Sequence, residues 1–158
     1  MKLKNTGIVV VLLIVLSLVL TGCGDPVKSD IQNFDKSCTS AAEVMASLEK
    51  SLSDVSGANA GKLLLESATK IESTKKTIEA IEVETQEVKD VKSILVEALG
   101  LTAEGCKIIG EAAENPEKAD LKAVEDAQAK LAKGTQLFNE FSTKYEELAI
   151  KHGLTVEK

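Results

Sequence analysis

Residues 27–55 read VKSDIQNFDKSCTSAAEVMASLEKSLSDV, and the apolar residues in this segment recur alternately four and three positions apart. The nine positions are Val27, Ile31, Phe34, Cys38, Ala41, Met45, Leu48, Leu52 and Val55. A repeat of this length places them on one stripe of an α-helix, as in helices that pack side by side. Pro26 suits a first helical turn, and Gly57 with Gly61 marks the stop. We therefore expect a helix over about 27–56.

The C-terminal part of the chain has a second regular stripe. It consists of Val124, Ala127, Leu131, Gly134, Phe138, Phe141, Tyr145 and Leu148. Asn115 is suited to cap this helix with Pro116 as its first residue, and Gly153 to close it. The pattern predicts a helix over about 116–151.

The middle of the chain is less regular. Residues 62–82 carry Leu64, Ala68, Ile71, Ile78 and Ile81 on a thinner stripe, and residues 86–114 carry Val88, Val91, Leu95, Ala98, Cys106 and Ile109. No Gly or Pro separates the two segments, so one continuous helix of roughly fifty residues is an alternative. Thr85 is a suitable N-cap, and so long a helix would extend about 75 Å with too little to cover it. We therefore prefer a break near residues 83–85.

Composition supports a helical protein throughout. The chain has no Trp, one Tyr, three Phe and two Pro, and is rich in Ala, Glu, Lys and Leu. Such a composition favours helix over sheet. The expected fold is all-α, an antiparallel up-down-up-down four-helix bundle over residues 27–152, with coiled-coil-like three-helix packing as the alternative.

The first 22 residues have the pattern of an export signal. Lys2 and Lys4 precede an apolar run over residues 8–20 that only Ser17 interrupts. As a helix this run would extend only about 20 Å, which is less than the roughly 30 Å of a bilayer core. A cleaved signal peptide over residues 1–22 is therefore a better interpretation than a permanent span.

The residues after the apolar run indicate the type of signal. Leu20-Thr21-Gly22-Cys23 resembles the lipobox of bacterial lipoproteins at all four positions. The resemblance implies cleavage between Gly22 and Cys23, with diacylglycerol on the thiol of Cys23 and often acylation, such as palmitate, on the new amine. Several long acyl chains make such an anchor effectively permanent. Residues 23–26 would form the lipidated N-terminus and a short tether.

The same resemblance implies a location on the extracytoplasmic side of a cell membrane. Gly24, rather than Asp, follows the lipid-bearing cysteine. In a cell with two membranes the family rule would send the protein to the outer one.

Charge argues against two classes of partner. The first 22 residues hold two of the 19 lysines and none of the 25 acidic residues, so the mature net charge is about −8. Nucleic acids and anionic lipid surfaces attract basic patches instead. We therefore expect no nucleic-acid partner. The chain also has no arginine, the residue best suited to bidentate recognition of phosphate.

The sequence offers no catalytic, cofactor or metal site, and we expect no enzyme activity. His152 is the sole imidazole and is expected at a solvated helix end, where positive charge is favourable. The glutamates lie between the stripe positions and lack the Glu-x-x-His spacing of metal sites in bundles. No His stands beside a Ser or Thr on a stripe to activate it as a nucleophile.

Two sets of stripe residues leave the function open. Gly100, Gly105, Gly110 and Gly134 indicate close helix approach, or alternatively a gap for an apolar ligand. Phe138, Phe141 and Tyr145 form an aromatic cluster that is typical of a core.

We expect a non-catalytic, membrane-anchored envelope lipoprotein that serves as a surface interaction or structural module for an envelope or extracellular protein. The alternative is a binding module that holds a small apolar or lipid ligand near Gly134 and the aromatic cluster.

Cys38 and Cys106 are the thiols that remain if Cys23 is acylated. In an up-down-up-down bundle they would differ in height by about 24 Å, whereas a disulfide needs Cα atoms within about 7 Å. We expect two buried, unpaired thiols. A crossover that made the first and third helices antiparallel would instead bring the two cysteines to similar heights.

Overall fold

The computed structural model describes residues 15–16, 24–53 and 59–157, and four long helices dominate it. They are α1 (Pro26–Ser53), α2 (Ala60–Glu79), α3 (Gln86–Glu114) and α4 (Leu121–Lys151), with a short 3₁₀ helix η1 (Pro116–Lys118) before α4. Two two-residue strands, β1 (Val15–Leu16) and β2 (Val156–Glu157), pair antiparallel, with Val15 opposite Glu157. Apart from this short pairing, all regular structure in the described residues is helical, so the predicted all-α class is confirmed.

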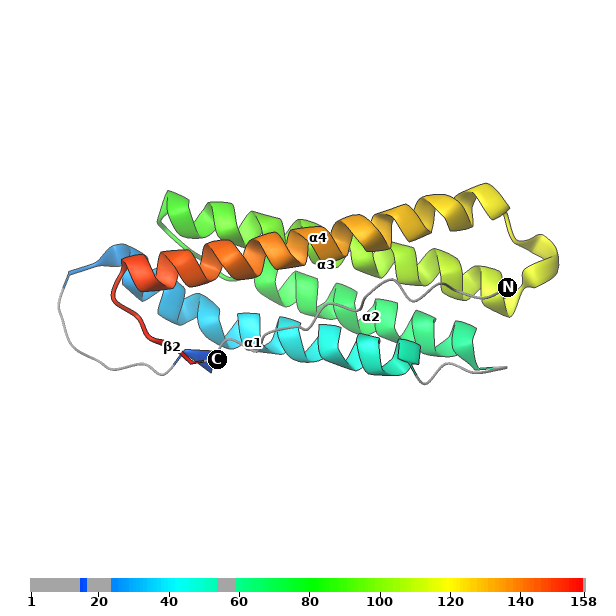
Figure 1. Cartoon of the computed structure of the whole chain (residues 1–158), viewed down its shortest axis with the longest axis horizontal. Helices are drawn as coiled ribbons and strands as arrows, with labels where there is room; N and C mark the ends of the chain where they lie inside the picture. The colour runs from blue at the N-terminus through cyan, green and yellow to red at the C-terminus, as the bar shows by residue number, and fades with distance from the viewer. Residues whose placement is uncertain (1–14, 17–23, 54–58, 158) are drawn as a thin grey trace.

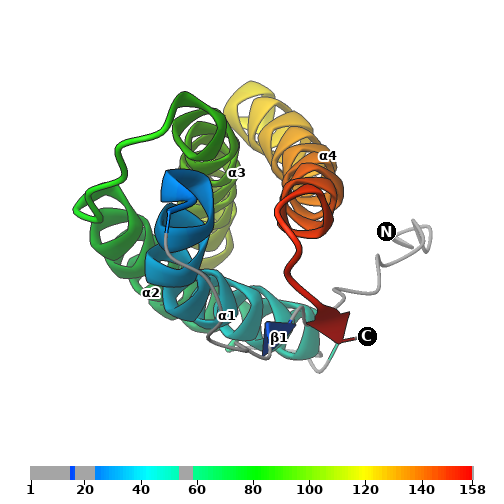
Figure 2. The ribbon, with the colours of Figure 1, turned by 90° about the vertical axis from the view of Figure 1, so that its left-hand side faces the viewer.

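Figure 1 shows how the four helices are arranged. Consecutive helices run in opposite directions, and the start of α1, the start of α3 and the end of α4 lie at the same end of the molecule, on the left. The η1 turn between α3 and α4 lies at the opposite end. Figure 2 views the molecule from the left-hand end and shows that α1 is inclined to the other helices.

The core contains residues from both predicted stripes. The largest fully buried side chains are Tyr145, Phe34, Ile31, Ile71, Ile78, Leu95, Leu99, Val88 and Cys106. From the stripe of the first helix, the residues from Ile31 to Leu48 are all buried. The side chains of Leu52 and Val55, together with Gly57, lie outside the part that the structure describes.

The break between α2 and α3 is confirmed, and the alternative of one continuous helix is wrong. The expected end of the second helix near residue 82 is also wrong, because α2 already ends at Glu79. The ammonium group of Lys92 donates to the carbonyl oxygen of Glu79 at 2.9 Å and also to that of Ile81. A side chain from α3 thus satisfies carbonyl groups that a longer α2 would have used internally.

The last helix begins later than expected. Asn115 closes α3, and Pro116 opens η1 without a side-chain cap, so neither residue starts α4. The carboxylate of Asp120 accepts hydrogen bonds from the backbone N–H groups of Lys122 at 2.9 Å and Ala123 at 3.4 Å. Asp120 is therefore the N-cap, and α4 begins at Leu121 rather than at residue 116.

Gly153 ends α4, as the sequence predicts. Its φ of 70° lies in the left-handed region, which suits glycine. The N–H of Leu154 donates to the carbonyl of Ala149 at 2.9 Å, and the N–H of Gly153 donates to that of Ile150 at 3.0 Å. These two bonds form the Schellman motif that commonly closes a helix.

Candidate functional site

Asp25 links the start of α1 to the end of α4. Its Oδ1 atom accepts hydrogen bonds from the backbone N–H groups of Val27 at 3.0 Å and Lys28 at 3.3 Å, so Asp25 caps α1. Its Oδ2 atom lies 2.6 Å from Nδ1 of His152. The hydrogen bond with His152 is the main reason why the pKa of Asp25 lies below its ordinary value.

His152 lies between two carboxylates. Its Nε2 atom is 3.3 Å from Oε2 of Glu87 in the first turn of α3, and the ammonium group of Lys151 pairs with the same carboxylate. The hydrogen bond from Lys151, helped by His152, lowers the pKa of Glu87. We call Asp25, Glu87, Lys151 and His152 the His152 cluster. It joins the starts of α1 and α3 to the end of α4.

The cluster corrects the expectation of a solvated His152. Only 14 % of the His152 side chain is exposed, because Asp25 and Glu87 flank the ring on both sides. Each ring nitrogen faces a carboxylate instead of a hydroxyl or thiol nucleophile. Within the described residues, no group of three or more His, Cys, Asp or Glu side chains is arranged to hold a metal ion.

Asp30 links α1 to the segment that precedes α3. Its Oδ2 atom accepts hydrogen bonds from the backbone N–H groups of Glu84 at 2.9 Å and Thr85 at 2.7 Å, and from the Thr85 hydroxyl at 2.7 Å. Burial alone would raise the pKa of Asp30, but the three hydrogen bonds outweigh it and lower the pKa. Thr85 does stand at the N-cap position, although its hydroxyl binds Asp30 instead of capping α3.

A buried polar contact lies inside the aromatic cluster. The Tyr145 hydroxyl donates to Oδ1 of Asp35 at 3.0 Å, and the Phe34 ring packs edge-on against the rings of Phe141 and Tyr145 at centroid distances of 6.3 Å and 6.0 Å. Burial raises the pKa of Asp35, although the Tyr145 hydrogen bond opposes the shift. The aromatic residues are core, as expected.

Away from the His152 cluster, glycines bring α2 and α4 each close to α3. A Cβ atom at Gly110 would lie 2.9 Å from the carbonyl oxygen of Gly61, and one at Gly134 would lie 2.5 Å from Oγ1 of Thr102. A Cβ atom at Gly105 would lie 2.7 Å from the Leu131 side chain. At these three glycines, the predicted close helix approach is confirmed. The space beside Gly134 that the alternative function needs is occupied by Thr102.

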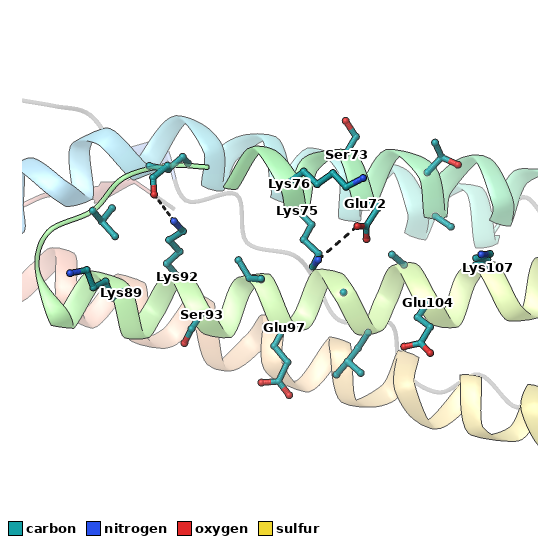
Figure 3. A pocket seen from close by; sticks show the side chains of 18 of the residues that line it. Glu72, Ser73, Lys75, Lys76, Lys89, Lys92, Ser93, Glu97, Glu104 and Lys107 are labelled. Carbon is teal, nitrogen blue, oxygen red and sulfur yellow. Dashed lines mark hydrogen bonds and ion pairs between the residues drawn. The ribbon is translucent and has the colours of Figure 1, made fainter. Parts of the chain in front are cut away.

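A surface groove runs between α2 and α3, with a volume of about 1690 Å³. Its apolar lining includes Leu65, Ala68, Val96, Leu101 and Ala103. Figure 3 shows Lys92 reaching from α3 toward the segment after α2, and Lys75 extending from α2 toward α3. A Cβ atom at Gly100 would lie 3.4 Å from Cε of Lys75, so this lysine lies over Gly100. The groove is therefore lined by Gly100, one of the four glycines that the sequence associates with an apolar ligand, but not by Gly134 or the aromatic cluster.

Both remaining cysteines are free thiols, and their predicted burial is confirmed. Burial raises the pKa of Cys38 well above its ordinary value and that of Cys106 to about 11. Because the thiolate is the reactive form, neither cysteine is suited to nucleophilic chemistry at neutral pH.

Sequence reasoning missed three aspartates, Asp25, Asp30 and Asp35. Asp30 and Asp35 share a face with Ile31 and Phe34, because Asp30 stands four residues before Phe34 and Asp35 stands four residues after Ile31. That spacing was a detectable sign of burial.

The cleavage and lipidation residues Gly22 and Cys23 lie outside the described residues.

Residues 28–153 match a family model described as "Uncharacterised lipoprotein PM1805". The match covers most of the chain, and the chain belongs to this family. It is a bacterial lipoprotein, a conclusion that the lipobox supports independently because it lies before the matched segment. No curated protein and no solved structure matches the chain significantly.

Proposed function

We propose that the mature protein is a non-catalytic envelope lipoprotein, held on the extracytoplasmic side of a membrane by lipid on Cys23. In a cell with two membranes, the outer one is the proposed site. The mature domain would act as an up-down-up-down helical bundle that presents a surface or structural module to an envelope or extracellular protein. No nucleic acid, cofactor or metal takes part.

The lipobox directly before the helical domain is the observation that carries this proposal. Leu20-Thr21-Gly22-Cys23 ends two residues before Asp25, which caps α1. The signal peptide, the lipid attachment site and the folded domain therefore follow one another with almost no intervening chain. None of the described helices is both long enough and apolar enough to span a bilayer.

Two features of the helical domain support a non-catalytic function. The ring nitrogens of His152 are occupied by carboxylates, and the thiols of Cys38 and Cys106 are buried with raised pKa values. The alternative of an apolar ligand near Gly134 is disfavoured, because Thr102 and the aromatic cluster fill that part of the bundle.

Metabolic labelling with palmitate tests the proposal. The unchanged chain should incorporate label and should be processed before residue 23, whereas Cys23→Ala should abolish both. Cys38→Ala is the matched control and should leave labelling and processing intact, because Cys38 is buried in α1. Retention of label and of cleavage in Cys23→Ala would contradict the proposed anchor.

A further inference from the structure

The position of Cys23 in the chain limits how far the bundle can lie from the anchored lipid. Only Gly24 separates Cys23 from Asp25. Consecutive Cα atoms are about 3.8 Å apart, so the Cα atom of Asp25 lies within about 8 Å of the Cα atom that carries the lipid. A chain this short cannot act as a flexible spacer between the membrane and α1.

Asp25 is also fixed to the rest of the domain. One carboxylate oxygen caps α1, and the other lies 2.6 Å from His152 at the end of α4. His152 in turn lies 3.3 Å from Glu87 at the start of α3. The residue two positions after the lipid-bearing cysteine is therefore held to three helix ends rather than to α1 alone.

The charges at this end reduce its repulsion from lipid headgroups. The mature protein is acidic, but the carboxylates of Asp25 and Glu87 face His152, and Glu87 also pairs with Lys151. The ammonium group of Lys151 offsets the negative charge of Glu87 beside the anchor, where unpaired carboxylates would be repelled by an anionic surface.

One large apolar side chain is exposed beside the His152 cluster. Ile150 is 59 % exposed in the last turn of α4, directly before Lys151 and His152. An exposed aliphatic group at this position can bury its surface among lipid headgroups and the upper acyl chains. Leu121, which is 83 % exposed, lies at the other end of the same helix.

We propose that the end face formed by Asp25, Glu87, Ile150, Lys151 and His152 rests on the lipid bilayer. The bundle then stands upright, and the η1 turn points away from the membrane, at the end opposite the His152 cluster (Figure 1). This inference rests on the proposed function, because it requires the lipid on Cys23.

Tryptophan fluorescence in vesicles tests the orientation, since the natural chain contains no Trp. Ile150→Trp and Leu121→Trp each place one Trp at an exposed apolar site at either end of α4. The full lipidated protein would be reconstituted into phosphatidylcholine vesicles that contain a headgroup-dansylated lipid as energy acceptor. The two sites are about 44 Å apart along the helix axis. Energy transfer to the dansylated lipid should therefore remove at least about three times as much Trp emission at residue 150 as at residue 121.

The outcomes separate this inference from the proposed function. Protein that floats with the vesicles but loses equal emission at both sites lies flat, which overturns the upright orientation and leaves the lipid anchor intact. Protein that does not float with the vesicles has no lipid anchor, which overturns the proposed function and the inference with it.

Asp25→Asn tests whether the His152 cluster holds the orientation. Asparagine is as good an N-cap as aspartate, so α1 should keep its start while the charge opposite His152 is lost. We expect the contrast between the two Trp sites to fall to about half, with the helix content by circular dichroism unchanged. Glu117→Gln, in the η1 turn at the opposite end, is the matched control and should leave the contrast unchanged. An unchanged contrast in Asp25→Asn would show that the cluster does not orient the bundle.

Discussion

Different kinds of contact hold the helices together in the two halves of the bundle. Near the His152 cluster, α1 is joined to α3 and α4 by carboxylates: Asp25 reaches His152, Asp30 reaches Thr85, and Asp35 reaches Tyr145. In the other half, the backbones of α2 and α4 each approach that of α3 directly. There, Gly110 packs on Gly61, and Gly105 and Gly134 allow α4 to lie against α3.

The difference shows what each kind of contact requires. A glycine contact needs only the absence of a side chain, and it fails when any atom is added. A buried carboxylate contact needs several donors, and it fails when one donor is removed, because the desolvated group then lacks a partner. Substitutions in the two halves should therefore differ in their dependence on size, hydrogen bonding and pH.

Phe34→Ala should have the largest effect on stability. Phe34 is fully buried and packs on the rings of Phe141 and Tyr145, so truncation leaves a cavity between α1 and α4. We expect the free energy of unfolding to fall by about 3–5 kcal/mol. Urea denaturation measures it, and Leu121→Ala at an exposed site should change it by less than about 0.5 kcal/mol. A loss below about 1 kcal/mol in Phe34→Ala would contradict the packing of its ring against Phe141 and Tyr145.

Gly110→Ala and Gly100→Ala should have opposite effects, although both change the same residue type in α3. A Cβ atom at residue 110 would press on the backbone oxygen of Gly61, and overpacking of this kind costs about 1–3 kcal/mol. A Cβ atom at residue 100 would meet only the flexible end of Lys75, so the alanine should stabilise the helix by about 0.5–1 kcal/mol. Thermal unfolding of the two variants checks this. If Gly110→Ala stabilised the protein, the close packing of Gly110 on Gly61 would be contradicted.

Tyr145→Phe should destabilise the protein by about 1–3 kcal/mol at neutral pH, because it removes the hydroxyl that donates to the buried carboxyl of Asp35. The same substitution should cost less in an Asp35→Asn background, where no buried charge is left without its donor. A double-mutant cycle by urea denaturation measures the coupling. Equal costs in the two backgrounds would mean that the charge on Asp35 adds nothing to this hydrogen bond.

Asp30 and Asp35 should give smaller effects of opposite pH dependence. The pKa of Asp30 is lowered in the fold, so its stabilisation is present above the ordinary value of 3.8 and is lost as pH falls through the lower folded value. The pKa of Asp35 is raised, so stability falls as pH rises from 3.8 through the raised value. Asp30→Asn should therefore be most destabilising at neutral pH, while Asp35→Asn should gain stability relative to the natural chain as pH rises.

Unfolding curves at pH 3 and pH 7 measure both differences. Parallel shifts of the two variants with pH would contradict the opposite environments of these aspartates.

Local signals in the sequence were enough to predict much of the fold. The stripe of the first helix and the closing role of Gly153 depend on residues close together in the chain, and both agree with the structure. The start of α4 was harder to predict, because Asn115-Pro116 and Asp120 are competing caps only a few residues apart and only Asp120 accepts backbone hydrogen bonds in the structure.

The polar contacts could not be predicted because they join distant residues. Asp30 and Thr85 are 55 positions apart, and Asp25 and His152 are 127 positions apart. No periodic pattern relates such pairs. His152 was expected to be solvated because it stands at a helix end. This expectation was wrong because the starts of α1 and α3 meet the end of α4 there.

The mass of the N-terminal peptide of the mature protein tests the lipoprotein account most directly. The protein would be purified from membranes in detergent and digested, and the N-terminal peptide analysed by mass spectrometry. We predict a peptide that begins at Cys23 and carries diacylglycerol on its thiol. A mature chain that begins at another residue, or at Cys23 with a free thiol, would contradict the account.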